Sequence, residues 1–190
     1  VDTTDPVLAG GSNGVAECTG SNPSSNAAYI AWRNSFGGVT ATDNCGTATM
    51  SYSEGSWTST GCTDTITVTF TATDECSRTT SKNQTFTISD TTNPTWTTVP
   101  SDSTVECGPG NAAAFTAWLN SFSGSDNCGT ALVTNDSTGL SNLCGSTGTE
   151  TVTFTLTDEC GNDITADATF TIVDTTDPVL AGGSNGVAEC

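Results

Sequence analysis

The stretch "DTTDPVLAGGSNGVAEC" occurs twice in this chain, at residues 2–18 and again at residues 174–190, and a degenerate version, "DTTNPTWTTVPSDSTVEC", begins at Asp90. From Asp2 to Asp90 is 88 residues and from Asp90 to Asp174 is 84, so two unlike repeats form a 172-residue supra-repeat. A fixed internal period constrains the fold strongly, because each copy should form the same structural unit. We interpret the chain as a window cut from a longer tandem array. The predicted domains are repeat 1 at residues 1–89, repeat 2 at residues 90–173, and the start of a third repeat at residues 174–190.

Threonine alternates with apolar residues in the second half of each repeat. The pattern is "TITVTFTAT" from Thr65 and "TVTFTLT" from Thr151. Strict period-2 alternation of β-branched and aromatic residues is typical of half-buried strands. Short strands, turn residues and no long helical pattern predict an all-β fold. We expect tandem immunoglobulin-like β-sandwich domains built from two antiparallel sheets.

A different periodicity lies between the "EC" and "DNC" motifs of each repeat. The pattern has positions two to four residues apart, at Ala28, Ile30, Trp32 and Phe36 in repeat 1 and at Phe115, Trp118 and Phe122 in repeat 2. This pattern predicts one short amphipathic helix inserted in each domain, covering an open end or edge of the sandwich. Aromatic residues at helical spacing usually belong to the core. The alternative for the two tryptophans is a platform on which carbohydrate stacks.

The charge composition excludes several classes of function. The chain has 3 Lys+Arg, 21 Asp+Glu and no His, for a formal net charge of −18. Nucleic acid is not an expected partner, because phosphate binding needs a basic footprint. Anionic lipid is disfavoured for the same reason, and without a run of 18 apolar residues we expect no direct membrane insertion. Export and anchoring sequences are expected to lie outside this window. Without His, or a nucleophile beside a base, we do not expect an enzyme.

Eight of the nine cysteines fall as four per repeat, which indicates disulfides formed in an oxidising compartment. A zinc site is disfavoured, since there is no CxxC and no His. Cys62 and Cys76 flank one strand whose ends lie about 30 Å apart, whereas bridged Cα atoms lie within about 7 Å, so these two cannot pair. Placing the remaining cysteines at the two poles of the sandwich predicts the bridges Cys45–Cys76 and Cys18–Cys62. The equivalent bridges of repeat 2 are Cys128–Cys160 and Cys107–Cys144, while Cys190 corresponds to Cys18 and would pair beyond the window.

Acidic residues gather in the linkers and turns of each repeat. Carboxylates that converge without a basic partner repel one another unless a cation is bound, and hard oxygen ligands without His favour Ca²⁺. The alternative is that these residues only form turns and caps, which Asp favours anyway. The candidate ligands are Asp2, Asp5, Asp43, Asp74 and Glu75 in repeat 1, Asp90, Asp126, Asp158 and Glu159 in repeat 2, and Asp174 in the third repeat.

Several motifs in combination resemble one family across the whole chain. They are the "DTTxP" linker, "VEC" at 105–107, "ATDNCG" at 41–46, "TVTFTATDEC" at 67–76 and "ATFTIVDTT" at 168–176. Together they resemble the hyalin-repeat-like, immunoglobulin-like units of giant surface adhesins in Bacteroidetes, including gliding bacteria. The resemblance implies an extracellular filament or adhesin on the bacterial cell surface, used in attachment or gliding. Its implied partners are neighbouring repeats, lateral copies in a filament, and surface glycans or a host or substratum.

The resemblance also implies modifications and ligands. Ca²⁺ at domain junctions carries over most directly to Asp2, Asp74, Asp90, Asp158 and Asp174. Repeat 1 departs from the pattern with "DECSR" where repeat 2 has "DECGN", so we expect the turn after Cys76, and its ligand set, to differ. The same bacteria attach O-glycans after Asp, which makes Thr3, Thr65, Thr91, Ser103, Ser137 and Thr175 candidate sites.

Two functions follow as hypotheses. The first is a structural repeat that acts as a rigid stalk, stabilised by disulfides and calcium. The alternative is that the repeats themselves are a carbohydrate-binding adhesive module.

Overall fold

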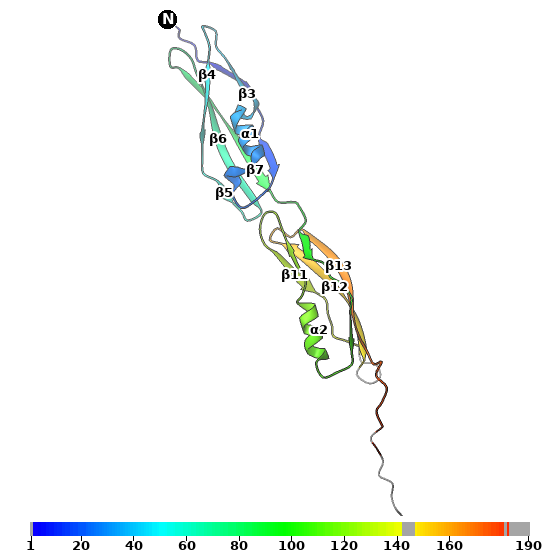
Figure 1. Ribbon diagram of the computed structural model, residues 1–190. Coiled ribbons are helices and arrows are strands. Elements are labelled where there is room, and N and C mark those ends of the chain that lie inside the picture. Colours follow the sequence, from blue (N-terminus) through cyan, green and yellow to red (C-terminus); the bar gives the residue numbers. More distant parts are fainter. Residues whose placement is uncertain (1, 142–146, 181, 183–190) are drawn as a thin grey trace, which may run out of the picture. The chain divides into compact units, whose positions relative to one another are not determined.

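The computed structural model describes residues 2–141, 147–180 and 182 (Figure 1). Contacts group the chain into two compact units. The first unit comprises residues 1–99, 122–134 and 155–165, and the second comprises residues 100–121, 135–154 and 166–190. The first unit therefore contains all of repeat 1 and the segments of repeat 2 that carry Cys128 and Cys160. The contacts described below between residues of the two repeats all lie inside this first unit, and the domain boundaries drawn from the sequence stay a prediction.

The all-β, immunoglobulin-like fold with one short α-helix per repeat is confirmed. Long strands form where Thr alternates with apolar residues, and short ones flank the turns. Repeat 1 contains the strands β1 (Val7–Gly10), β2 (Gly14–Glu17), β3 (Val39–Thr42), β4 (Thr49–Glu54), β5 (Thr58–Ser59), β6 (Thr63–Thr73) and β7 (Thr79–Ser89). Repeat 2 contains β8 (Thr95–Thr98), β9 (Ser103–Glu106), β10 (Ser123–Ser125), β11 (Ala131–Asn135), β12 (Gly148–Asp158) and β13 (Asp163–Val173).

The main sheet of repeat 1 has the strand order β2-β7-β6-β4, with β5 also beside β6, and a second small sheet pairs β1 with β3. Strand β6 shows why the Thr-rich sequence folds this way. Its apolar residues Ile66, Val68 and Phe70 are at most 1% exposed, whereas the intervening threonines are more exposed. Phe86 lies opposite Ile66 in the register of β6 with β7 and is equally buried. The alternating residues therefore form one face of the core. Repeat 2 repeats the plan with the sheet β11-β12-β13-β9 and the pair β8–β10.

One edge of each main sheet differs from the expected antiparallel arrangement. Strand β2 pairs with β7 in parallel, and β9 pairs with β13 in parallel. The expectation of a purely antiparallel sandwich is therefore wrong at this edge. Parallel neighbours need a long crossover connection, often one that contains a helix. The helix that follows β2 or β9 provides the first part of that connection.

The two predicted helices are α1 (Ala27–Asn34) and α2 (Asn111–Leu119), with the short 3₁₀ turns Pro23–Ser25 and Phe36–Gly38 on either side of α1. Asn26 caps α1, since its side-chain oxygen accepts from the backbone N–H groups of Ala28 (3.0 Å) and Tyr29 (3.2 Å). The sequence reasoning missed Tyr29, which is 0% exposed and lies edge-on to Phe86 with ring centroids 5.3 Å apart. The helix therefore closes the core of repeat 1 with an aromatic cluster.

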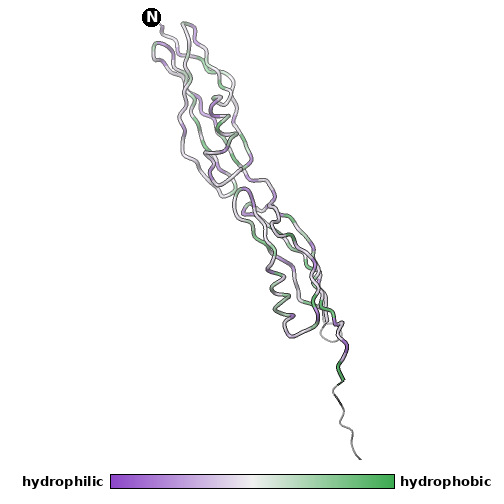
Figure 2. Tube along the Cα trace, in the orientation of Figure 1, coloured by the Kyte–Doolittle hydropathy of each residue, from purple (hydrophilic) through white to green (hydrophobic). Residues whose placement is uncertain are grey.

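Hydrophobic residues are scattered in short stretches along the trace (Figure 2). Within the part of the chain that the structure describes, no helix is both long enough and apolar enough to cross a membrane.

Candidate metal centres and disulfides

Three predicted acids of repeat 1 meet at the ends of elements. Asp2 precedes β1, Asp43 directly follows β3, and Asp74 directly follows β6. One carboxylate oxygen of each lies within 4.8 Å of the others. We call Asp2, Asp43 and Asp74 the first acid cluster.

Turn formation uses only part of the hydrogen-bonding capacity of this cluster. Asp43 Oδ2 accepts from the Cys45 N–H (2.9 Å), and Asp74 Oδ1 accepts from the N–H groups of Cys76 and Arg78 (2.8 Å each). Asp43 Oδ1 and Asp74 Oδ2 are buried and have no hydrogen-bond partner among the described residues, and Asp74 as a whole is only 7% exposed. Buried carboxylate oxygens without a partner are costly. One oxygen of each residue therefore takes part in a turn, and the other oxygen has the chemistry of a possible cation ligand.

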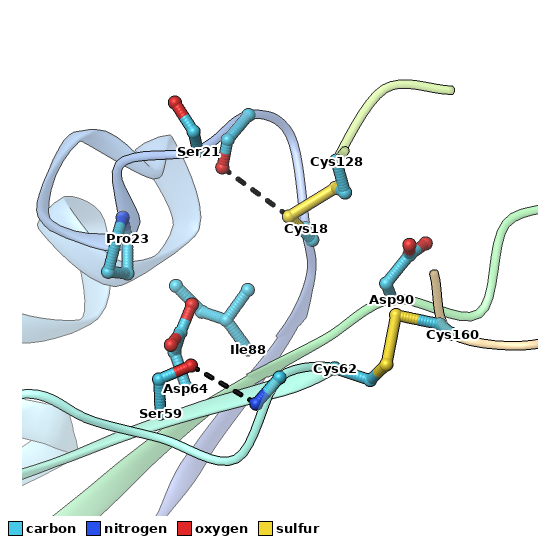
Figure 3. A pocket seen from close by; sticks show the side chains of 12 residues that line it. Cys18, Ser21, Pro23, Ser59, Cys62, Asp64, Ile88, Asp90, Cys128 and Cys160 are labelled. Atoms are coloured by element: carbon cyan, nitrogen blue, oxygen red, sulfur yellow. Dashed lines mark hydrogen bonds between the residues drawn. A yellow bond between two sulfur atoms is a disulfide. The ribbon is translucent and has the colours of Figure 1, made fainter. Parts of the chain in front are cut away.

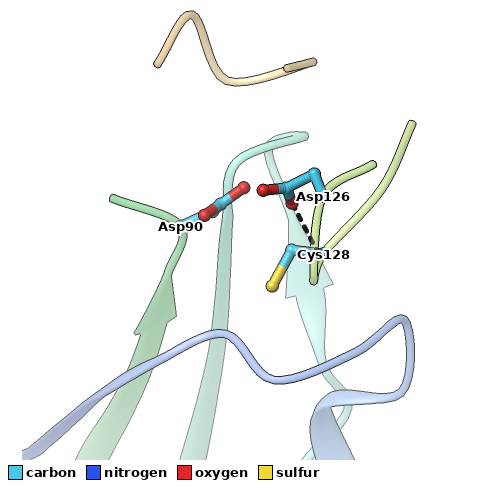
Figure 4. A group of neighbouring side chains, drawn as sticks. All are labelled: Asp90, Asp126 and Cys128. Atoms are coloured by element: carbon cyan, nitrogen blue, oxygen red, sulfur yellow. Dashed lines mark hydrogen bonds between the residues drawn. The ribbon is translucent and has the colours of Figure 1, made fainter. Parts of the chain in front are cut away.

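The second acid cluster consists of Asp90, Asp126 and Asp158, the equivalents in repeat 2. Asp90 and Asp126 point toward each other beside Cys128 (Figure 4), and Asp90 also groups with Asp158 beside Cys160. Both sulfurs are in disulfides, so they are not thiolate ligands. Asp126 Oδ2 accepts from the Cys128 N–H (2.6 Å), whereas its Oδ1 is buried and has no hydrogen-bond partner in the part of the chain that the structure describes.

Within the second cluster the pKa of Asp90 is raised, whereas the pKa of Asp158, against the raising effect of burial, is lowered overall by hydrogen bonds from its turn. Burial raises the pKa of Asp90, and the negative charges of Asp126, Asp158 and Glu17 raise it further, against a lowering hydrogen bond from Thr92. This is the response expected of a carboxylate among like charges, and a bound divalent cation would reverse it.

The two clusters differ where the sequences "DECSR" and "DECGN" differ. Asp158 Oδ2 accepts from Asn162 Nδ2 (2.8 Å), whereas in repeat 1 the equivalent Arg78 donates instead to Asp5 Oδ1 (2.7 Å). The expected change in the backbone turn is wrong, because Ser77 adopts φ 68°, close to the 86° of Gly161. The substitution changes the partners of the carboxylates and leaves the turn the same.

The other candidate ligands lie outside the two clusters, among the described residues. Asp5 pairs with Arg78, and Asp174 accepts from its own linker at the Thr176 N–H (3.2 Å). Glu75 accepts from Thr47 Oγ1 (3.1 Å), and Glu159 accepts from Thr130 Oγ1 (2.6 Å). Glu75 and Glu159 thus each accept a hydrogen bond from the loop that follows a "DNC" motif.

The predicted disulfide pairing is wrong for the described cysteines. The bridges are Cys18–Cys128 and Cys62–Cys160, with Cα–Cα distances of 5.9 Å and 5.3 Å. They replace the predicted Cys18–Cys62 and Cys128–Cys160, and the predicted Cys45–Cys76 bridge is absent because both residues are free and exposed. The prediction placed the cysteines at the two poles of one sandwich and assumed that bonded partners lie within the same repeat. Each observed bridge instead joins a cysteine of repeat 1 to a cysteine of repeat 2. The Cys107–Cys144 pairing and the partner of Cys190 involve residues outside those described.

Both disulfides line a pocket of about 310 Å³ inside the first unit (Figure 3). Asp64, Ile88 and Asp90 also line it, and Asp90 belongs to the second acid cluster. The cysteines and the carboxylates therefore belong to one locality of the fold.

Two glutamates that the sequence reasoning missed hold the "DTT" linkers. Glu17 accepts from the Thr91 N–H and hydroxyl (2.7 Å each) and from the Thr92 hydroxyl (3.1 Å). Glu106 does the same with Thr175 (2.8 Å for both bonds) and Thr176 (3.0 Å). The pKa of Glu17 is lowered mainly by the hydrogen bond from the Thr91 backbone N–H, and the pKa of Glu106 mainly by that from Thr175. The signal was present, since a Glu before Cys recurs with every "DTT" linker. We call each such arrangement a glutamate clamp.

The candidate glycosylation sites lie in varied settings. The Thr91 hydroxyl donates to Glu17 and the Thr175 hydroxyl donates to Glu106, in the glutamate clamps. The Ser137 hydroxyl donates to Glu150 (2.9 Å). Thr3 is exposed in the linker, whereas Thr65 lies within β6 and Ser103 begins β9. Glycan attachment stays a prediction.

The two helix tryptophans, Trp32 and Trp118, pack against the core, and the three basic residues have partners within the chain. Trp118 is 8% exposed, and Trp32 packs on Phe70 and Phe86 with ring centroids 5.4 Å and 5.1 Å away. This packing favours the core interpretation over a carbohydrate platform. The three cations pair internally: Arg33 with Glu54, Arg78 with Asp5, and Lys82 with the Gly10 carbonyl (2.7 Å).

No family model and no curated protein matches the chain. Solved structures with a similar arrangement include cadherin ectodomains. Drosophila N-cadherin EC1-4 is 10% identical, with a TM-score of 0.30, over 91% of this chain and 51% of that one. Human mucin-like protocadherin EC1-2 is 10% identical, with a TM-score of 0.32, over 90% of this chain and 98% of that one. The protocadherin gammaB4 extracellular domain is 12% identical, with a TM-score of 0.35, over 93% of this chain and 35% of that one. Similarity at this level supports no conclusion about function, and the resemblance to bacterial adhesin repeats stays a prediction.

Proposed function

We propose that this chain is a structural segment of an extracellular repeat array, in which each repeat is fixed to the next by two disulfides and by Ca²⁺. The observation that carries the proposal is the coincidence, in one locality, of bridges between repeats and buried carboxylates. On this proposal the chain acts as a spacer that stiffens the array, and it has no catalytic role.

The residues that would hold Ca²⁺ are the two acid clusters. Carboxylate oxygens are the ligands that Ca²⁺ takes, and its flexible coordination suits a site assembled from loops. The unpartnered oxygens of Asp43, Asp74 and Asp126 fit this donor chemistry, and they are poor ligands for a soft metal. A bound Ca²⁺ would offset the repulsion within each cluster. By sequence equivalence, Asp174 would supply the same kind of ligand to a following repeat.

The disulfides support an oxidising, extracellular location. Their sequence separations are 110 and 98 residues. In the chain-entropy account, a loop of about 100 residues corresponds to about 4–5 kcal/mol for a single bridge. A joint of this kind suits a stalk or filament on a bacterial surface that serves attachment or gliding, with neighbouring repeats and lateral copies as partners. Surface glycans or a substratum would be met elsewhere in the assembly, and O-glycans on exposed sites such as Thr3 are compatible with this role.

Small-angle X-ray scattering of the oxidised chain tests the stiffening role. When chelator replaces Ca²⁺, we expect the distribution of interatomic distances to broaden, while the near-ultraviolet circular dichroism signal of the folded cores is retained. Asp126→Asn keeps an acceptor for the Cys128 N–H and removes the charge, so it should show the broad distribution even with Ca²⁺. Asp163→Asn, an exposed acid outside both clusters, is the matched control.

Two results would contradict the proposal. One is a scattering profile that is the same with Ca²⁺, with chelator and in Asp126→Asn. The other is specific binding of the isolated chain to a glycan array, which would favour the adhesive alternative.

A further inference from the structure

Two exposed cysteines of repeat 1 have counterparts in repeat 2 that form disulfides. Cys45 and Cys76 are free and exposed, whereas their equivalents in repeat 2, Cys128 and Cys160, are both bridged to repeat 1. Resting on the proposed function of a disulfide-linked array, we propose that Cys45 and Cys76 form a two-cysteine attachment site, occupied through two disulfides by another repeat of this kind that precedes repeat 1. We call this pair the docking cysteines.

The backbone presents the docking cysteines in the same way as the bonded pair. The Cys45 N–H donates to Asp43 (2.9 Å), as the Cys128 N–H donates to Asp126 (2.6 Å). The Cys76 N–H donates to Asp74 Oδ1 at 2.8 Å. The Cys160 N–H donates to Asp158 Oδ1 at 2.7 Å. The turns that position the bridged sulfurs in repeat 2 are therefore already formed in repeat 1.

The first acid cluster supplies an independent observation at the same place. Asp74 is 7% exposed, and its Oδ2 is buried in the cluster without a hydrogen-bond partner. The equivalent Asp158 Oδ2 has Asn162 as a partner, and that asparagine also donates to the Asp90 carbonyl (3.5 Å) in the linker between the repeats. Repeat 1 thus has the cysteine and carboxylate positions of the junction between the repeats, and Asp74 Oδ2 differs from Asp158 Oδ2 because Arg78 stands at the position of Asn162.

The observed bridges also define the register of the partner. The "DNC" cysteine bonds the "EC" cysteine Cys18, and the "DEC" cysteine bonds Cys62. In a repeat of the second type the equivalent positions are Cys107 and Cys144, of which Cys144 lies outside the described residues. The order of repeats supports this partner, because residues 174–190 repeat residues 2–18 after a repeat of the second type. Cys45 should therefore bond an "EC" cysteine, not Cys76.

The chemistry is thiol–disulfide exchange and needs an external disulfide as oxidant. A docking thiolate attacks one sulfur of that oxidant, forms a mixed disulfide and releases one thiol. The thiolate of the incoming repeat then displaces the second thiol and completes the bridge. Each bridge releases two protons and two electrons from the protein thiols, and the electrons reduce one oxidant disulfide to two thiols.

A concatemer provides the test, with residues 1–173 followed directly by residues 2–190, a join that keeps the natural local sequence. The first copy carries Cys45→Ser and Cys76→Ser, so any linked peptide with a docking cysteine comes from the second copy. The protein is refolded in reduced and oxidised glutathione with chelator, blocked with N-ethylmaleimide, digested without reduction and mapped by mass spectrometry. We expect the second copy's Cys45 to be linked to Cys107 of the first copy, and its Cys76 to another upstream cysteine. In the 190-residue chain, the control, both should be recovered blocked or carrying glutathione.

Recovery of free docking cysteines in the concatemer, or of a Cys45–Cys76 peptide, overturns the proposal. The Cys18–Cys128 and Cys62–Cys160 peptides report folding in the same digest. The same mapping on the native array, isolated without reductant, gives a second reading that does not depend on refolding. Since chelator is present, failure here is distinct from failure of the calcium proposal.

Discussion

The glutamate clamp on the first linker makes a quantitative prediction. In Glu17→Ala the three hydrogen bonds to Thr91 and Thr92 are lost. Hydrogen bonds to charged groups contribute about 1.5–3 kcal/mol when shielded from water, but Glu17 is half-buried and water competes for it. We therefore take about 1 kcal/mol for each bond. The free energy of local opening of the linker should fall by about 2–3 kcal/mol.

Amide hydrogen exchange followed by NMR measures this opening. A loss of 2–3 kcal/mol corresponds to exchange about 30- to 150-fold faster at the Thr91 amide, while the core amide of Val68 should be unchanged. Glu17→Gln keeps an acceptor and loses the charge, so it should fall between wild type and Glu17→Ala. Glu106→Ala should accelerate the Thr175 amide in the same way. Unchanged exchange at Thr91 in Glu17→Ala would refute the clamp.

The clamp should also depend on pH. The backbone hydrogen bond from Thr91, with the other Thr bonds, holds the pKa of Glu17 below its ordinary value. A folded pKa below the unfolded one means that the stabilisation is present above about pH 4.3 and is lost as the pH falls through the folded pKa. Thr91 protection should therefore decrease in acid, and Glu17→Gln should remove that part of the pH dependence.

Two further predictions concern single-residue substitutions. Ser77 adopts φ 68°, and the equivalent residue in repeat 2 is Gly161. Ser77→Gly should therefore raise the free energy of unfolding by up to about 1 kcal/mol, and Gly161→Ser should lower it by a similar amount. Unchanged denaturation midpoints in both variants would contradict this prediction. Glu54 accepts from the Tyr29 hydroxyl (2.9 Å) and pairs with Arg33, and the hydrogen bond from Arg33 is the main cause of the lowered Glu54 pKa. The stabilisation by this ion pair should be lost in acid, so Glu54→Gln should be less stable than wild type at pH 7, and its stability should depend less on pH. A dependence of stability on pH like that of wild type would contradict the assignment.

The sequence predicted the elements of each repeat well, because local patterns decide them. Alternation in β6 predicts its buried face, and helical spacing around Trp32 and Trp118 predicts α1 and α2. Tyr29 was missed although it lies three residues before Trp32, because Ile30 was taken as the apolar position of that turn; the observed helix turns Tyr29 toward Phe86.

The sequence could not decide contacts between repeats. Cys18 and Cys62 lie at one pole of repeat 1, and nothing local distinguishes a partner in the same repeat from one in the next. The acid clusters were largely predicted, since Asp is the residue that these turns prefer. Asp5 lies in an ion pair outside the first acid cluster, and the Arg at position 78 in place of Asn was the signal for that pair. The glutamate clamps pair two motifs that were each noticed separately.

Calcium titration of the full oxidised chain by isothermal calorimetry, in buffer freed of metal, tests the central claim most directly. Each of the two described acid clusters should take up Ca²⁺, so wild type and Asp163→Asn should show two binding events per chain. Asp126→Asn should remove one event and Asp74→Asn the other, with Mg²⁺ binding more weakly at both sites. Absence of binding, or binding that survives both substitutions together, would contradict the assignment of these carboxylates as a calcium-bearing junction.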